Sequence, residues 1–311
     1  MYKRIVKLFL VAVLAITLTG CTKYLKNDDN KYVTNELTGQ RLTENILCQP
    51  ENEDVIEIYK DNGYKLNKLP KCDKMHVTSG GYEGVWTTIF VKPLAWVIVE
   101  MGHAVKNYGL AIILITLIIR LLLIPLTQKS AMQSENMKLA QPDLTKLEKK
   151  YKDKKDQASQ QQKAQEMMLI YKKYNINPLS GCLFALIQIP LFFAFYEALN
   201  RLPAVFEENF LSFQMGTSPY VGITNGSWQY VIIILLVILT TFLSFKLSSS
   251  ATGNQDQQKQ MKLMTNIMVI MISIAAFTIS TGIAIYWIIN SGFTVCQNLV
   301  VRRMKKNVKK K

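Results

Sequence analysis

Charged and chemically reactive side chains are scarce in this 311-residue chain. Charged residues make up 19% of it and hydrophobic residues 49%, whereas about a quarter of an average soluble protein is charged. The sequence has only two histidines, no glycine-rich phosphate loop, no HExxH pair and no Ser–His–Asp set. These absences argue against an enzyme and against a nucleotide or metal cofactor.

The sequence also lacks the internal repeat of an alternating-access transporter. Its apolar residues instead form long blocks, which indicates an all-α polytopic membrane protein. A net charge of +15 could suggest nucleic acid binding. The basic residues, however, lie between or after the apolar blocks, as in cytoplasmic loops, so we do not expect a DNA-binding protein.

Residues 1–20 have the pattern of a secretory signal peptide. Three basic residues precede about eleven apolar ones, a run too short to span a membrane comfortably. The stretch ends in LTGC, which looks like a bacterial lipoprotein cleavage box with Cys21 as the acylated residue, the usual site of palmitate. The alternative is an uncleaved anchor. Acylation would fix the mature N-terminus outside the plasma membrane.

Residues 21–86 are polar and show no sustained periodicity, so we expect an irregular extracytoplasmic segment. Cys48 and Cys72 both lie there, where a disulfide is permitted. His76 follows Cys72 closely, but two cysteines and one histidine make a poor metal site. Cys182 and Cys296 fall in apolar stretches and are expected to be buried.

Residues 87–107 predict an amphipathic helix in the outer interface. Its polar face would carry Lys92, Trp96, Glu100, His103 and Asn107. Its apolar face would carry Phe90, Leu94, Val97, Ile98, Met101 and Val105. Pro93 suits the first turn.

The core, residues 108–301, predicts five membrane spans. They cover residues 109–126, 181–199, 228–246, 264–281 and 283–301, the last two separated only by STG. Eleven lysines in residues 128–179 and seven basic residues after Val301 place both segments in the cytoplasm. The basic tail is 302–311. An outside N-terminus and five spans give the same cytoplasmic C-terminus.

Residues 128–179 predict an antiparallel helical hairpin in the cytoplasm. Leu144, Leu147 and Tyr151 recur at helical spacing, as do residues between Ala164 and Tyr174, with KDKKD between the two arms. Pro142 is expected to interrupt the first arm. The lysines form a solvated face, or they contact ribosomal RNA or anionic lipid.

Arg120 is the one charge in the apolar run from Tyr108 to Thr127. An arginine in mid-span costs about 2.5–3.5 kcal/mol on insertion scales, so it needs a purpose. Every other span offers polar groups in the same half of the membrane: Gln188, Thr240, Ser273, Asn290, Ser291 and Thr294. The only spanning carboxylate, Glu197, lies roughly 15 Å away in depth. We therefore expect Arg120 to face a hydrated cavity open to the cytoplasm, the alternative being a side chain that snorkels to the headgroups.

Three stretches resemble the YidC/Oxa/Alb family of membrane protein insertases. They are the arginine-containing run before PLT, NPLSGC joined to LIQIP, and STGIAIYWIINSGFTVCQNLVVRR. The resemblance covers residues 87–305, and the lipoprotein start with five spans is similar to the Gram-positive form. It implies a groove lined by Arg120, Gln188 and Trp287, open to the cytoplasm and inner leaflet and closed outside.

The same resemblance implies a function without covalent chemistry or cofactor. The groove would draw the polar, often acidic, end of a nascent membrane protein or lipoprotein into a thinned bilayer, alone or beside the Sec translocon. The hairpin and basic tail would recruit substrate and ribosome. Two other readings remain open. One is a small-anion channel or transporter that uses Arg120, although the outer halves of the spans are apolar. The other is a lipoprotein scaffold.

Overall fold

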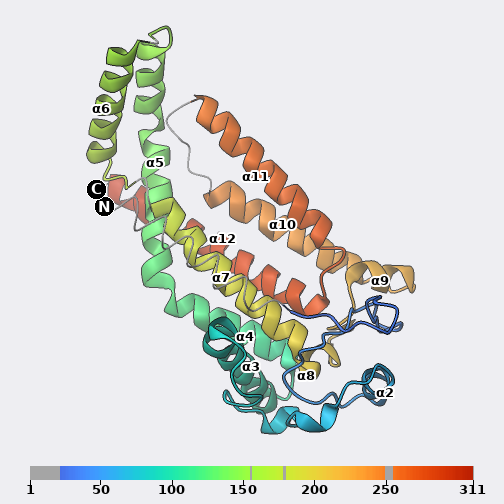
Figure 1. Cartoon of the computed structure of the whole chain (residues 1–311). Helices are drawn as coiled ribbons and strands as arrows, with labels where there is room; N and C mark the ends of the chain where they lie inside the picture. Colours follow the sequence, from blue (N-terminus) through green and yellow to red (C-terminus); the bar gives the residue numbers. More distant parts are fainter. Residues whose placement is uncertain (1–21, 155, 178–179, 249–254, 311) are drawn as a thin grey trace. The chain divides into compact units, whose positions relative to one another are not determined.

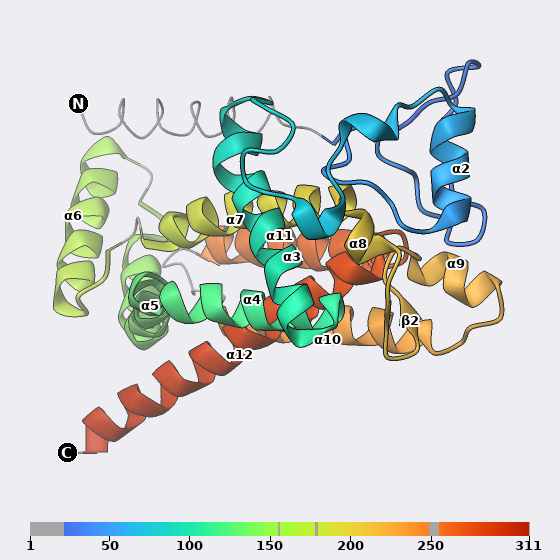
Figure 2. The same ribbon diagram turned by 90° about the horizontal axis from the view of Figure 1, so that it is seen from below.

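The protein is mainly helical in a computed structural model that describes residues 22–154, 156–177, 180–248 and 255–310 (Figures 1 and 2). The expected signal peptide and Cys21 lie outside the described residues. The α-helices are α2 (Glu53–Asp61), α3 (Lys92–Val105), α4 (Tyr108–Leu122), α5 (Ile124–Tyr151), α6 (Gln157–Lys173), α7 (Ser180–Arg201), α8 (Pro203–Phe206), α9 (Pro219–Thr224), α10 (Tyr230–Ser248), α11 (Gln255–Ala275) and α12 (Thr281–Lys310). A two-stranded antiparallel sheet, β1 (Asn209–Phe210) with β2 (Phe213–Gln214), departs from the all-α expectation.

The chain divides into two compact units. The first comprises Met1–Ile118, Gln188–Val237 and Ala275–Ile289, and the second comprises Ile119–Ile187, Ile238–Ile274 and Asn290–Lys311. We describe the contacts of each unit separately.

Within the described part of the chain, three helical stretches are long and apolar enough to cross a membrane: Thr87–Val105, Tyr230–Ser248 and Thr281–Met304. The pair α4 and α5 adds a fourth if it forms one span. The apolar part of α11, Lys262–Ala275, is shorter. The structure thus supports a multi-pass protein, while five spans and an interfacial position for residues 87–107 remain predictions.

The first expected span, residues 109–126, ends earlier than its composition suggests. The chain bends by 69° between α4 and α5, at Leu123. Pro125 explains the break, because it lacks an N–H and disfavours helical backbone at the residue before it. Arg120 therefore lies in the last turn of α4 rather than in mid-span.

The turn between the last two helices was predicted at STG and lies earlier, between Ala275 and Thr281. The first residue of α12 explains the shift. Both the backbone N–H and the hydroxyl of Thr281 donate to the carbonyl of Thr217, at 3.0 and 2.8 Å. These bonds, made within the first unit, hold the start of α12 at Thr281.

The outer segment is not irregular, contrary to expectation. It forms α2 and several isolated β-bridges, and Figure 2 shows it as loops around α2. A separate hydrophobic core organises it, made of Leu25, Leu42, Ile46, Val55, Tyr59 and Phe206. Phe206 belongs to α8, so this segment packs on the connection that follows α7. The two therefore lie on the same side of any membrane the helices cross.

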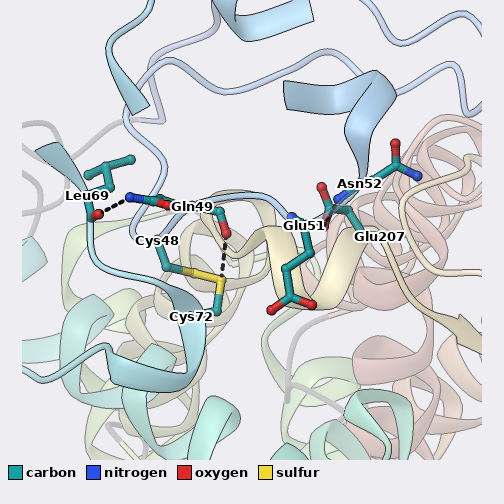
Figure 3. The surroundings of a disulfide bond; sticks show 7 residues. All are labelled: Cys48, Gln49, Glu51, Asn52, Leu69, Cys72 and Glu207. Atoms are coloured by element: carbon teal, nitrogen blue, oxygen red, sulfur yellow. Dashed lines mark hydrogen bonds between the residues drawn. A yellow bond between two sulfur atoms is a disulfide. The ribbon is translucent and has the colours of Figure 1, made fainter. Parts of the chain in front are cut away.

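A disulfide joins Cys48 to Cys72, the pair singled out in the sequence, with their Cα atoms 4.8 Å apart (Figure 3). Next to it, one carboxylate oxygen of Glu207 accepts hydrogen bonds from the backbone N–H groups of Glu51 and Asn52, at 2.9 and 3.3 Å. The segment is thus closed on itself and held to the α8 region.

The side of α3 that packs inside the protein is not the apolar face that was expected to meet the membrane. Val91, Ala95, Ile98, Val99 and Gly102 are buried, and of the expected apolar face only Ile98 is among them. Lys92, expected on the wet face, is buried.

Lys92 is buried because Glu83 pairs with it. Its ammonium lies 3.0 Å from a carboxylate oxygen of Glu83, and it donates to the carbonyls of Ser79 and Gly81. Arg201, also buried, pairs with the other oxygen of Glu83. This ion-pair cluster ties the start of α3 to the end of α7.

The helical hairpin of α5 and α6 is confirmed, and the two helices lie side by side in Figure 1. Met137, Ala140, Leu144 and Ile176 form its core. Contrary to expectation, α5 runs through Pro142 without a break.

Exposed ion pairs join the two arms of the hairpin. Lys150 contacts Glu166 at 2.6 Å and Lys173 contacts Asp143 at 2.7 Å. Ion pairs between solvent-exposed side chains contribute little to stability, so the apolar contacts hold the hairpin together.

Candidate functional site

Arg120 is 2% exposed and lies in the second unit. Its Nε donates a hydrogen bond of 2.7 Å to Oδ1 of Asn290, which is also buried. Protein therefore surrounds the guanidinium, which argues against a snorkelling side chain. The expected hydrated cavity around Arg120 remains a prediction.

Polar side chains continue along α12 below Asn290. The hydroxyl of Thr294 donates to the Asn290 carbonyl at 3.0 Å, Gln297 donates to the hydroxyl of Thr127 at 2.8 Å, and Asn298 donates to the hydroxyl of Ser248 at 3.0 Å. These residues are spaced by four, seven and eight from Asn290, so they share one face of the helix. The second unit thus contains a polar stripe that starts at Arg120.

Two residues of this stripe, Thr127 and Gln297, were not expected from the sequence. A signal was available for Gln297, because polar residues at that spacing are unusual on an apolar helix. Nothing in the sequence pointed to Thr127, because it lies just beyond residue 126, where the first span was expected to end.

Three other residues of the second unit were expected at the site: Thr240, Ser273 and Ser291. Ser291 is buried beside Asn290 in sequence, and Thr240 is half-buried, next to the fully buried Thr241. Ser273 donates to the carbonyl of Val269 in its own helix at 2.7 Å, so its hydroxyl is satisfied locally. Its part in a common site therefore remains a prediction.

Gln188 and Trp287 belong to the first unit, where both are half-buried. Trp287 packs edge-on against Phe192, with ring centroids 5.2 Å apart. Phe195 and Tyr286 stack at 4.1 Å nearby on the same two helices. Trp287 therefore sits at the end of an aromatic cluster that joins α7 to α12.

Cys296, expected to be buried, is exposed on α12. Position 296 lies off the buried face that carries Asn290, Thr294 and Asn298, which explains the difference. The side chain of Cys182 lies outside the described residues.

Asn290 offers the guanidinium of Arg120 a neutral acceptor. A guanidinium is a planar cation whose geometry suits carboxylate and phosphate groups. The described residues contain no cluster of three or more metal-ligating side chains. Such a site can attract and orient a polar or acidic segment.

Residues 100–310 match the family model described as 60Kd inner membrane protein. A membrane protein insertase YidC of Oceanobacillus iheyensis is 39% identical over 226 residues, which cover 71% of this chain and 85% of that protein. The membrane protein insertase MisCA of Bacillus subtilis is 36% identical over 225 residues, covering 71% and 82%.

Among solved structures, one described as an active YidC insertase with its first transmembrane domain resolved is similar at a TM-score of 0.44 and 22% identity. It covers 79% of this chain and 52% of that one. The sequence matches to bacterial relatives and the apolar helices indicate a multi-pass bacterial membrane protein. The chain belongs to the YidC/Oxa/Alb family of membrane protein insertases.

Proposed function

We propose that this chain inserts membrane proteins, and lipoproteins among them, through an intramembrane groove whose charged group is Arg120. The observation that carries the proposal is the buried guanidinium of Arg120, whose Nε donates a hydrogen bond of 2.7 Å to Asn290. An arginine in an apolar helix is costly, so its presence there favours a functional role.

The polar end of a nascent client would enter from the cytoplasmic side and meet this cation. An acidic or polar group would take the place of Asn290 as acceptor, since charge-assisted hydrogen bonds are stronger than neutral ones. The polar stripe of Thr294, Gln297 and Asn298 would offer further hydrogen bonds along the path. Gln188 and Trp287, both in the first unit, would also contact the client.

The apolar part of the client would then move into lipid along the surface of the helices. Burial of its own hydrophobic surface drives that step, so no nucleotide or covalent intermediate is required. The lipid anchor at Cys21, an outside N-terminus and a cytoplasmic C-terminus complete the proposed topology.

The α5–α6 hairpin would receive clients on the cytoplasmic side. Its basic residues, with those of the tail, suit a ribosome, and the protein would work alone or beside the Sec translocon. The exposed Met168 and Leu169 on α6 offer an apolar surface next to those charges.

A depletion experiment tests the proposal. Cells that lose their own insertase receive this chain on a plasmid, and insertion of a single-span client is followed by protease protection of its tail. We expect insertion to be restored. Failure of an expressed, membrane-located chain to restore insertion of any family client would contradict the proposal.

The alternative, a small-anion channel, needs a polar path through the outer half of the membrane. Exposed outer positions such as Leu110, Ile232 and Leu235 are apolar, and the comparisons give no channel among the relatives quoted above. Anion conductance of the purified protein in liposomes would favour the channel instead.

A further inference from the structure

A cavity of about 510 Å³ lies in the first unit, away from Arg120 in sequence and from the proposed groove residues. Its walls come from the outer segment, the end of α7, α9 and the connection before α12. All of these lie on the side of the outer segment, as the shared core around Phe206 requires.

The cavity is lined by hydrogen-bond donors and one cation. Arg41 supplies the charge, and Tyr24, Tyr196, Ser218 and Ser280 supply hydroxyl groups. None of the described residues that line it is acidic. A site with donors and a cation but no carboxylate favours an anion.

A buried donor in the wall has no partner of its own. Asn200 is 8% exposed, and its side-chain Nδ2 makes no hydrogen bond to any described residue. Buried amide N–H groups are normally satisfied, so an exception asks for a missing acceptor. A ligand oxygen in the cavity would provide one.

The cavity wall is fixed in shape. Gly39, with a φ of +66°, approaches Val221 so closely that a Cβ there would lie 2.2 Å from its methyl carbon. The hydroxyls of Tyr24 and Tyr196 lie 3.1 Å apart, joining the outer segment to α7. The outer segment is therefore clamped on α7 and α9, and the cavity is preformed.

Aromatic side chains place the cavity at the membrane surface. Tyr220, which lines it, is 58% exposed, and Trp228 nearby in the chain is 71% exposed. Tyrosine and tryptophan are enriched at the depth of lipid headgroups. The anion present at that depth is the phosphate of a phospholipid.

We propose that this cavity binds the phosphate headgroup of an anionic phospholipid from the leaflet on the side of the outer segment. Arg41 would pair with the phosphate, the tyrosine hydroxyls would donate to its oxygens, and Asn200 would donate from the buried wall. The site is independent of insertion and would anchor the outer segment to the bilayer surface.

Native mass spectrometry of the full chain in detergent tests the proposal, with phosphatidylglycerol and phosphatidylcholine as probes. Arg41→Gln removes the cation. Lys26→Gln is its matched control, because Lys26 and Arg41 both lie over the ring of Tyr32, at 5.4 and 5.0 Å, but only Arg41 lines the cavity. Asn200→Asp replaces the buried donor by an acceptor of the same shape.

We expect the unaltered chain to retain phosphatidylglycerol over phosphatidylcholine, and Arg41→Gln and Asn200→Asp to weaken phosphatidylglycerol binding about fivefold or more. Lys26→Gln should bind as before. Equal losses in the Arg41 and Lys26 variants, or none in either, would overturn the site. Stabilisation by inorganic phosphate as strong as that by phosphatidylglycerol would overturn the lipid as its occupant.

Discussion

Arg120 and Asn290, 170 positions apart in the chain, meet through a hydrogen bond of 2.7 Å from Nε to Oδ1 in the second unit. One is the charge in the last turn of α4 and the other begins the polar stripe of α12. Their contact gives the buried cation a neutral acceptor, and the proposed function depends on the positive charge of Arg120.

The first prediction changes the partner and leaves Arg120 in place. Asn290→Asp puts a carboxylate within hydrogen-bond distance of the guanidinium and neutralises it. Insertion of a client with an acidic tail should fall roughly tenfold, which corresponds to about 1.4 kcal/mol of lost attraction. The measurement is the fraction of client inserted in depleted cells.

Asn298→Asp is the comparison for that experiment. It is the same change on the same helix at another buried residue, which contacts Ser248 rather than Arg120. Because Asn298 lies on the proposed path, we expect a loss of insertion that is smaller than that of Asn290→Asp. If both variants lose insertion to the same extent, the charge of Arg120 does not explain the effect.

The second prediction concerns the ion-pair cluster around Glu83. Glu83→Gln leaves the buried Lys92 and Arg201 without their carboxylate. Loss of one partner of a buried pair costs about 3–5 kcal/mol. Because Glu83 is partly exposed and backbone carbonyls also accept from both cations, we expect a loss of about 1–3 kcal/mol.

Thermal unfolding of the purified protein measures that loss. Glu57→Gln, on the exposed face of α2, removes one charge of the same kind without an ion pair and should change little. An unfolding temperature for Glu83→Gln equal to that of the control would refute the structural role of the cluster.

The third prediction removes the disulfide. Cys48 and Cys72 are separated by 24 residues, and opening a loop of that size costs up to about 3.5 kcal/mol in the chain-entropy model. The double variant Cys48→Ser, Cys72→Ser should unfold its outer segment more readily, seen as faster proteolysis there. A reductant should accelerate proteolysis of the unaltered chain to the same rate and leave the variant unchanged; any further acceleration of the variant would mean that another bond matters.

The fourth prediction is a pH dependence from Glu207. Burial raises the pKa of Glu207 to about 7, against an ordinary value of 4.5, although backbone N–H groups of Glu51 and Asn52 oppose the shift. Between these values the folded chain holds a proton that the unfolded chain has lost. The contribution to stability is therefore complete below pH 4.5 and is lost as the pH rises through about 7.

The variant Glu207→Gln tests whether Glu207 lowers the stability of the protein as the pH rises. Glutamine keeps an acceptor for the two backbone N–H groups but does not titrate. The unaltered chain should lose stability relative to the variant between pH 5 and 8, measured as the difference in unfolding temperature. A difference that stays constant over this range would show that Glu207 titrates normally.

Long apolar runs made the main helices predictable, and helical periodicity made the α5–α6 hairpin predictable, because composition and spacing define such elements locally. The sequence also singled out Arg120 and Asn290 as polar groups in the membrane. The sequence did not predict that Arg120 and Asn290 are in contact. The bend before Pro125 places Arg120 at the end of its helix, where an uninterrupted span would not place it. That bend depends on one proline inside an otherwise uniform run.

Features set by contacts between distant residues could not be predicted from local pattern. Lys92 is buried because it pairs with Glu83, which also pairs with Arg201. Helical spacing alone assigns Lys92 to the polar face of the helix. The outer segment seemed irregular because its core residues, such as Leu25, Leu42 and Val55, follow no period. These residues form one hydrophobic core together with Phe206 of α8, the short helix that follows α7.

The most direct test of the account replaces Arg120 by alanine and by lysine in cells depleted of their own insertase, with Arg41→Ala, at an exposed arginine outside the proposed groove and tail, as control. Two clients are compared, one with an acidic outside tail and one with that tail neutralised. We predict that alanine blocks the acidic client, that lysine restores it, and that the neutral client is affected far less. If Arg120→Ala inserts both clients as the unaltered chain does, the buried charge is not the working part of the site.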